Sequence, residues 1–149
     1  MRHVQIKAID ASDFGAWVLL WKRYQRFYDV DIPEPVTRQT WERFLEPVEP
    51  MHAALAVMSD RALGLVHFIH HRSTWTTSDD CYLQDLFVEE DARGGGIGRA
   101  LIEHVYEQAK RRGISRVYWQ THESNHNAMQ LYDRIASRSP FIQYRKLIV

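Results

Sequence analysis

The 149-residue chain is long enough for one domain with a buried core, and 45% of its residues are hydrophobic, which excludes a disordered protein. The 19 Lys and Arg residues balance 19 Asp and Glu residues, so no net field favours nucleic acid or an anionic membrane surface. The single cysteine cannot form an internal disulfide, and no apolar run approaches the roughly 20 residues of a transmembrane helix. We therefore expect a single cytoplasmic domain, residues 1–149, with neither a nucleic-acid nor a membrane partner.

Hydrophobic periodicity predicts alternating strands and helices along the chain. Apolar and polar residues alternate over 3–9, which indicates a strand, and Asp10 or Ser12 can cap the helix that follows. Next we expect a loop over 28–36, a helix over 37–45, strands over 52–58, 62–71 and 81–89, a helix from 97 to about 113, a strand over 116–121, a helix over 127–136 and a last strand over 141–149. This order predicts a sheet covered by helices, an α/β or α+β fold.

A glycine-rich segment lies between the predicted strand over 81–89 and the helix that starts at 97. Its glycines are Gly94, Gly95, Gly96 and Gly98. Such a loop is typical of phosphate binding, because backbone N–H groups and the positive end of the helix dipole converge on an anion. A Walker A loop is excluded because Arg99 and Ala100 open the helix, and a dinucleotide loop because Arg99 or Leu101 stands where its third glycine belongs.

The pattern Arg93-x-x-Gly96-x-Gly98 resembles the Arg/Gln-x-x-Gly-x-Gly/Ala pyrophosphate loop of the GNAT family of N-acetyltransferases. Two more segments resemble that family in the same order. They are YLQDLFVEEDAR at 82–93 and the motif Asn125-x-x-Ala128-x-x-Leu131-Tyr132. The first half of the chain, with WKRYQRFY at 21–28, resembles more loosely a fungal subgroup of histone and polyamine acetyltransferases. The chain departs from the family where Ala136 and Ser137 replace a Gly-Phe pair.

This resemblance implies a fold, a co-substrate and a set of binding residues. The implied fold is a mixed, mostly antiparallel sheet of about six or seven strands, splayed between the fourth and fifth and flanked by about four helices. The implied co-substrate is acetyl-CoA, with no metal, and a homodimer is expected. The implied acetyl-CoA site comprises Leu86, Phe87, Val88, Arg93, Gly94, Gly95, Gly96, Ile97, Gly98, Arg99, Asn125 and Ala128.

The resemblance also assigns catalytic roles. Tyr132 would protonate the leaving thiolate, and the usual tyrosine pKa near 10 keeps such an acid protonated at neutral pH. The base is less well defined: Asp85 and Glu123 are candidates, and an ordered water chain or an already neutral amine is the alternative. Gln84 stands where the fungal subgroup often has Glu, and glutamine cannot act as a base. Strand alternation places Asp85 opposite to Gln84, on the face of Cys81, Leu83 and Phe87, unless a bulge intervenes.

The acceptor is expected to be a primary amine, and Tyr24, Tyr28, Gln84 and Glu123 are the predicted substrate-binding residues. Three acids in the loop over 28–36 would suit a small cationic amine such as a polyamine or an amino acid. A histone-like lysine acetyltransferase is the first alternative, and a non-catalytic acyl-CoA sensor is the second. Retention of Tyr132 argues against the sensor. His67 and His70 fall on opposite faces of a strand, which argues against a metal site.

Overall fold

The computed structural model describes residues 3–149 as two compact units, residues 3–119 and Gln120–Val149. The first unit holds the whole sheet and three of the α-helices. The second holds helix α4 (His126–Ile135) and the C-terminal segment. No helix in the described part of the chain combines the length and the hydropathy needed to cross a bilayer.

The sheet of the first unit has five strands in the order β1-β2-β3-β4-β5. They are β1 (Gln5–Ala8), β2 (Met51–Met58), β3 (Arg61–His71), β4 (Asp80–Val88) and β5 (Val117–Tyr118). The first three neighbouring pairs are antiparallel, and β5 is parallel to β4. The expected α/β class and the mostly antiparallel, mixed sheet are thus confirmed.

The expected number of six or seven strands is wrong for the described residues. The predicted strand over 116–121 contracts to β5, and the segment over 141–149 has no assigned strand. Ile142, Tyr144 and Ile148 in that segment are at least 80% exposed, so their alternating pattern buries no apolar surface that would stabilise a strand.

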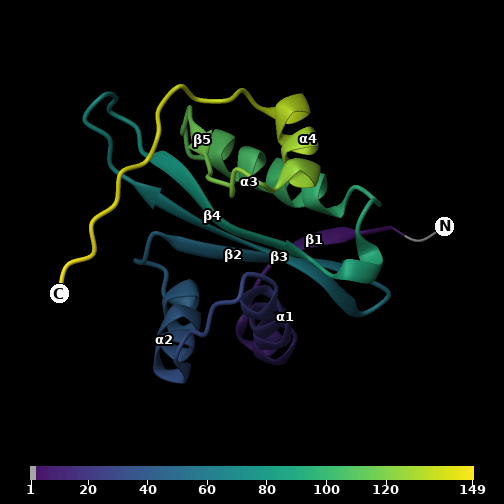
Figure 1. Ribbon diagram of the computed structural model, residues 1–149. Helices are drawn as coiled ribbons and strands as arrows, with labels where there is room; N and C mark the ends of the chain where they lie inside the picture. Colours follow the sequence, from purple (N-terminus) through teal and green to yellow (C-terminus); the bar gives the residue numbers. More distant parts are fainter. Residues whose placement is uncertain (1–2) are drawn as a thin grey trace. The chain divides into compact units, whose positions relative to one another are not determined.

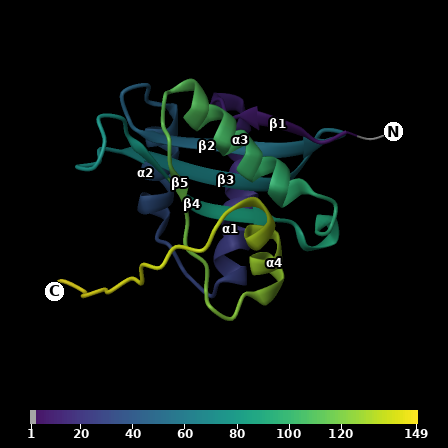
Figure 2. The same cartoon turned by 90° about the horizontal axis from the view of Figure 1, so that it is seen from above.

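Helices cover both faces of the sheet in the first unit (Figure 1; Figure 2). Helices α1 (Phe14–Phe27) and α2 (Glu34–Leu45) lie on one face, and α3 (Ile97–Arg111) lies on the other. Helix α2 starts three residues before its predicted start, because Pro35 lies in the first turn, where no backbone N–H is required. The prediction that Asp10 caps the first helical segment is confirmed, since its side chain accepts a hydrogen bond from the Ser12 amide at 2.8 Å.

The main core lies between α1, α2 and the sheet. Trp17 is fully buried at its centre, and its ring lies 5.0 Å from that of Trp41 and 6.1 Å from that of Trp21. Since each buried aromatic side chain contributes roughly 2–3 kcal/mol, these rings fix α1 and α2 on the sheet. The other buried members of the cluster are Leu20, Leu55, Leu65 and Phe87.

A second group of buried side chains on the opposite face contains a pair of histidines. The rings of His52 on β2 and His70 on β3 lie 4.7 Å apart, and the buried Nε2 atom of each has no hydrogen-bond partner among the described residues. Burial lowers the pKa of His52 to about 4, and the neighbouring His70 and Arg112 reinforce that shift. Burial also lowers the pKa values of His70 and His104. This pair is therefore neutral in the folded protein at neutral pH.

We expect this pair to make folding sensitive to acid. Because the pKa of His52 is lower in the folded than in the unfolded protein, its contribution is complete above about pH 6.5 and is lost as the pH falls toward 4. The loss should be of the order of 1–3 kcal/mol. In urea unfolding experiments, the free energy of unfolding of His52→Phe should fall less between pH 7 and pH 4 than that of the wild type. The exposed His126→Asn change should leave the slope as it is, and equal slopes for all three proteins would contradict the expectation.

Candidate active site

The glycine-rich loop connects β4 to α3. Gly94 and Gly96 both have φ of +84°, a conformation that suits glycine, and Gly96 is the N-cap of α3 without a side-chain cap. A β-carbon at either position would meet no heavy atom within 4 Å, so the loop surface is open. The first N–H groups of a helix have no intrahelical partner, and here no side chain caps them. This loop therefore fits an anionic group such as a pyrophosphate.

Two arginines flank the glycine loop. Arg93 donates from Nε to the carbonyl oxygen of Val88 at 2.9 Å, and its guanidinium lies 4.7 Å from the ring centre of Phe27 and 5.6 Å from that of Phe87. This bond uses Nε, so the terminal nitrogens of Arg93 are the donors left for an anion. Arg99 is exposed and paired with Glu103 at 2.8 Å. Arg93 thus contacts both the backbone of β4 and two aromatic rings, whereas the ion pair of Arg99 lies within α3.

The second half of β4 has an open edge. In the part of the chain that the structure describes, β5 pairs with β4 only at Cys81↔Val117 and Tyr82↔Tyr118, whereas β3 pairs with β4 along its whole length. The backbone of β4 from Leu86 to Val88 thus has a strand neighbour on one side only. An extended ligand with amide groups can add to such an edge as a further strand. The structure thus agrees with the expected splay between the fourth and fifth strands.

A β-bulge lies in the middle of β4. Asp85 pairs with His67, but the next residue of β3, Phe68, pairs with Leu83, so Gln84 is the additional residue. Directly opposite residues in an antiparallel pair share a face. Since the ring of His67 contacts α1 and that of Phe68 contacts α3, Asp85 and Leu83 lie on opposite faces.

This bulge corrects the expected position of Asp85. Strand alternation grouped Asp85 with Cys81, Leu83 and Phe87, and the grouping with Cys81 and Leu83 is wrong. Cys81 pairs with His70 on the α3 face, whereas Phe87 belongs to the core on the α1 face. Asp85 therefore lies on the α1 face together with Phe87, and Gln84 is exposed.

Asp85 is the end of a buried chain of hydrogen bonds. Trp17 donates from Nε1 to Nε2 of His67 at 2.9 Å, and Nδ1 of His67 lies 2.9 Å from Oδ2 of Asp85. The hydroxyl of Tyr24 donates to Oδ1 of Asp85 at 2.7 Å. The Asp85 side chain is 12% exposed, and both of its oxygens have a partner. The chain includes Asp85 and Tyr24, two of the predicted site residues.

Neither Trp17 nor His67 is among the functional residues predicted from the sequence. They lie 50 positions apart, so no local spacing connects them. The one available signal was His67 itself, a polar residue within the apolar run ALGLVHFIHH. A buried imidazole in such a strand requires hydrogen-bond partners, and those partners had to come from elsewhere in the chain.

Tyrosines surround the carboxylate of Asp85. Tyr24 and Tyr28 lie at the C-terminal end of α1 with rings 4.7 Å apart, and Tyr82 lies on β4. Burial and the negative charge of Asp85 together raise the pKa values of Tyr24 and Tyr82. Burial also raises the pKa of Tyr28, against the opposing effect of Arg93. These phenols therefore stay protonated at neutral pH and can donate hydrogen bonds.

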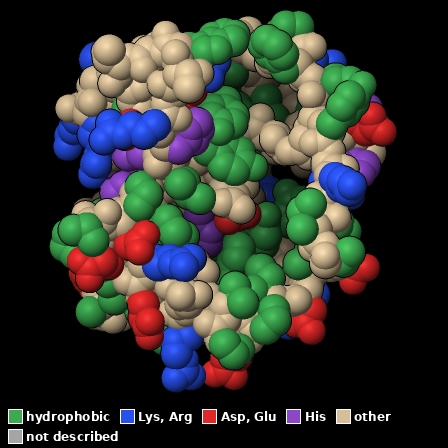
Figure 3. All heavy atoms as spheres, turned by 90° about the vertical axis from the view of Figure 1, so that its left-hand side faces the viewer, with side chains coloured by type: hydrophobic (Ala, Val, Ile, Leu, Met, Phe, Trp, Pro, Cys, Tyr) green, Lys and Arg blue, Asp and Glu red, His purple; other side chains and the backbone are tan. Residues whose placement is uncertain are grey.

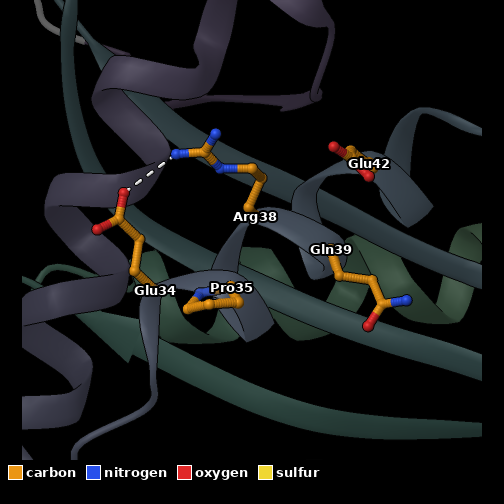
Figure 4. A pocket seen from close by; sticks show the side chains of 5 residues that line it. All are labelled: Glu34, Pro35, Arg38, Gln39 and Glu42. Atoms are coloured by element: carbon orange, nitrogen blue, oxygen red, sulfur yellow. Dashed lines mark hydrogen bonds and ion pairs between the residues drawn. The ribbon is translucent and has the colours of Figure 1, made fainter.

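The acidic loop after α1 is exposed, as expected. Asp29 has φ of +53°, and Asp31 is exposed. Glu34 lies in the first turn of α2 and accepts a hydrogen bond from Arg38 at 3.1 Å. A hollow of 560 Å³ lies beside α2, lined by Glu34, Pro35, Arg38, Gln39 and Glu42 (Figure 4). Its lining comes from one helix and contains none of the predicted binding residues, so we assign it no role.

Four predicted site residues belong to the second unit. Asn125 is the N-cap of α4 and donates from Nδ2 to the hydroxyl of Thr121 at 3.3 Å. Ala128 and Tyr132 follow on α4 at spacings of three and seven from Asn125, so the three share one helix face. Glu123 is exposed in the turn before α4. The roles of these four residues stay predictions.

Comparison with known proteins identifies the family. The model of the acetyltransferase (GNAT) family matches residues 17–136, which span most of both units. The chain belongs to the GNAT family. It is therefore an acetyl-CoA-dependent N-acetyltransferase, and the GNAT resemblance of the glycine loop is explained.

Two relatives of this chain are named as N-acetyltransferases. D-amino-acid N-acetyltransferase HPA3 of Saccharomyces cerevisiae is 37% identical over 145 residues, which cover 96% of this chain and 90% of the relative. Thialysine N-epsilon-acetyltransferase of Sus scrofa is 37% identical over 75 residues, 50% of this chain and 42% of the relative. The first similarity covers nearly the whole of both chains.

Solved structures agree with the GNAT fold. A probable acetyltransferase has a TM-score of 0.86 at 23% identity, covering 97% of this chain and 98% of its own. The aminoglycoside N-acetyltransferase AAC(6')-Iy in complex with CoA has a TM-score of 0.82 at 18% identity, covering 98% and 96%. At these identities the likeness shows the fold alone.

Proposed function

We propose that this enzyme transfers the acetyl group of acetyl-CoA to the primary amine of a small cationic acceptor, an amino acid or a polyamine. The observation that carries the proposal is the carboxylate of Asp85, which lies on the α1 face of the sheet and is held by hydrogen bonds on both oxygens. The similarity to a D-amino-acid N-acetyltransferase over nearly the whole chain supports an amino-acid acceptor.

The glycine loop and the open edge of β4 are the proposed donor site. Backbone N–H groups from Gly94 to Arg99 would hold the pyrophosphate, and the backbone of Leu86, Phe87 and Val88 would hold the amide-containing arm. When bound, acetyl-CoA supplies a thioester, which is an activated acyl group. The open loop surface and the bare strand edge both fit such a ligand. Asn125 and Ala128, in the second unit, stay predicted acetyl-CoA-binding residues.

Asp85 is the proposed group that binds the acceptor amine and removes its proton. An alkyl ammonium has a pKa near 10.4, so it must lose a proton before its nitrogen can attack a carbonyl. A carboxylate has about four acceptor positions, and Tyr24 and His67 use two of them. The remaining positions can accept N–H groups of the acceptor. Tyr28, Gln84 and Glu123 are retained as proposed substrate-binding residues.

Tyr132 is the proposed general acid for the departing thiolate. Removal of its hydroxyl in Tyr132→Phe should lower kcat by about 10²-fold, the low end for general acid catalysis, because a thiolate leaves fairly well unaided. Acetyl-CoA affinity should be nearly unchanged. The matched control is Tyr144→Phe, which removes an exposed hydroxyl in the C-terminal segment. Wild-type kcat in Tyr132→Phe, with chemistry limiting the rate, would exclude the acid role.

The acidic loop is expected to attract a cationic acceptor. Replacing Asp29, Asp31 and Glu34 by Asn, Asn and Gln should raise the acceptor KM and flatten its salt dependence, since salt screens exposed charges. Asparagine tolerates the positive φ of Asp29. The KM for acetyl-CoA should not change.

A second triple variant controls for net charge. Glu46→Gln, Asp60→Asn and Glu107→Gln also remove three exposed charges, and Asp60 shares the positive φ of Asp29. This control should keep the wild-type acceptor KM and salt dependence. Equal effects of the two triple variants would show that the loop is ordinary solvated surface.

A panel of amines tests the proposed acceptor class directly. D- and L-amino acids, ornithine, polyamines and a histone-like lysine peptide are each incubated with acetyl-CoA, and released thiol is measured. We expect turnover of small cationic amines. Preference for the peptide would favour a protein lysine acetyltransferase, and no thiol release with any of these amines would exclude the proposed acceptor class. Homodimer formation and cytoplasmic location stay predictions.

A further inference from the structure

The hydrogen bonds around His67 fix which of its nitrogens carries the proton. An indole N–H can only donate, so Nε2 of His67, 2.9 Å from Nε1 of Trp17, must be an unprotonated acceptor. The proton of the neutral imidazole then resides on Nδ1, which donates to Oδ2 of Asp85 at 2.9 Å. Protonation of Nε2 would set two N–H groups against each other inside the core. Each group in this series of hydrogen bonds therefore donates to the next, from Trp17 to His67 and from His67 to Asp85.

We infer that His67 is a positioning residue for acetyl transfer, which holds the Asp85 carboxylate as a fixed hydrogen-bond acceptor for the amine of the substrate. This inference rests on the proposed function, because it needs Asp85 to receive the acceptor. His67 is 3% exposed and so cannot contact a substrate in bulk solvent. It acts through Asp85, and Trp17 acts through His67.

The residues packed around His67 hold its imidazole ring in the orientation that these hydrogen bonds require. The titratable group that His67 contacts is Asp85 of β4, and Tyr24, Tyr28 and Tyr82 in turn lie near Asp85. The other elements supply aromatic rings: Trp17 and Trp21 of α1 lie 5.9 and 4.7 Å from the imidazole, and Phe44 of α2 lies 4.8 Å away. The ring is thereby held by packing as well as by its hydrogen bonds.

The direction of the hydrogen bonds from Trp17 through His67 to Asp85 limits which chemical group of the acceptor can bind there. Every hydrogen bond in this series points toward Asp85, so the carboxylate can only accept from a further partner. A ligand group that offers N–H donors, a primary ammonium or amine, complements it. A carboxylate or phosphate at the same point would face an anion and is excluded. This polarity explains how an amine is selected at this position, whatever the remainder of the acceptor.

Two tryptophan variants test the fixed polarity. In Trp17→Phe the indole N–H is lost, so Nε2 of His67 is free to take a proton, and kcat/KM for the acceptor should show a dependence on pH that the wild type lacks. The matched control is Trp21→Phe, on the same helix and also against His67, because the buried Nε1 of Trp21 has no hydrogen-bond partner among residues 3–149. It should show no such dependence. The same pH profile for both variants would overturn the inference.

Variants of His67 test its action through Asp85. His67→Leu removes the donor and should lower kcat/KM for the acceptor by roughly 10- to 100-fold, with the KM for acetyl-CoA unchanged. His67→Asn should restore most of the loss, because its amide N–H can occupy the place of Nδ1. In an Asp85→Asn background, His67→Leu should have little further effect, since the two side chains act as one unit. An equal loss in both backgrounds would mean a purely structural role.

The outcomes separate this inference from the proposed function. A wild-type enzyme that releases no thiol with any amine would overturn the proposed function. An active wild type with additive His67 and Asp85 effects would overturn the inference alone. Circular dichroism checks the fold of each variant. If His67→Leu does not fold, the comparison of Trp17→Phe with Trp21→Phe decides.

Discussion

Gly96→Glu should raise the Kd for acetyl-CoA by about 100-fold, equivalent to about 3 kcal/mol, and leave the fold intact. Gly96 is the N-cap of α3 with φ of +84°, and its surroundings are open, so a glutamate there would extend over the proposed pyrophosphate site. The added carboxylate would repel an anion and compete for the N–H groups at the helix start. Isothermal titration calorimetry with acetyl-CoA and with CoA measures the change.

A glycine at the other end of α3 supplies the control. Gly113 also has positive φ, +71°, and open surroundings, so Gly113→Glu carries similar backbone strain and the same charge away from the loop. Both variants should lose stability to a similar extent, of the order of 1 kcal/mol, but only Gly96→Glu should lose acetyl-CoA affinity. An intermediate Gly96→Gln variant separates bulk from charge. Unchanged acetyl-CoA affinity in Gly96→Glu would mean that the glycine loop is not the pyrophosphate site.

Asp85→Asn should lower kcat by about 10²- to 10⁴-fold for an acceptor that is an ammonium at the assay pH. An amide at position 85 cannot take a proton from the acceptor. Its NH₂ group would also face either the N–H of His67 or the hydroxyl of Tyr24, and only the hydroxyl can reverse its hydrogen bond. Steady-state kinetics with saturating acetyl-CoA measures the loss.

If Asp85 acts as a base, the loss of kcat in Asp85→Asn should depend on the pKa of the acceptor amine. For an amine of low pKa, already neutral in solution, no proton has to be removed, and the effect of Asp85→Asn should shrink. Asp79→Asn, an acid just before the same strand that is paired with Arg72, controls for the change in charge and should keep wild-type kcat. If every amine lost the same factor, Asp85 would bind the acceptor without acting as its base.

The features that the sequence predicted best depend on contiguous residues. The strand before the loop, the glycines and the amphipathic helix after them lie within 81–113, and each follows from local hydrophobic periodicity or backbone freedom. Pro35 shows where local reasoning went wrong, because prolines predicted a loop where one of them opens α2.

The arrangement around Asp85 could not be predicted in this way. Whether Gln84 forms a bulge depends on how β4 pairs with β3, a strand about 15 residues earlier, and strand alternation alone put Asp85 with the wrong neighbours. Trp17 and His67 come from α1 and β3, and their partnership follows from packing. The last predicted strand failed for the same reason, since a strand requires a partner and 141–149 has none assigned.

The charges on the surface are mixed in sign, as the balanced composition of the chain predicts. Figure 3 shows both Lys or Arg and Asp or Glu side chains on one face, together with hydrophobic side chains, which agrees with the balanced charge of the chain. Since neither sign dominates this face, the proposed attraction for cations has to come from a local group of acids rather than from the protein as a whole.

The bulge at Gln84 affects the edge of β4 because it adds one residue to the strand, whatever the type of that residue. The last residue of β4 paired with β5 is Tyr82, and β4 bends at the very next positions, where Gln84 protrudes. Deleting Gln84 would leave Leu83 and Asp85 on the faces they already occupy and would remove only the bend. A straighter β4 would give β5 a longer stretch to pair with, and so a more complete sheet. The extra residue is therefore a place where the sheet forgoes backbone hydrogen bonds, and hence stability, and leaves free the edge that we propose as the binding site for acetyl-CoA.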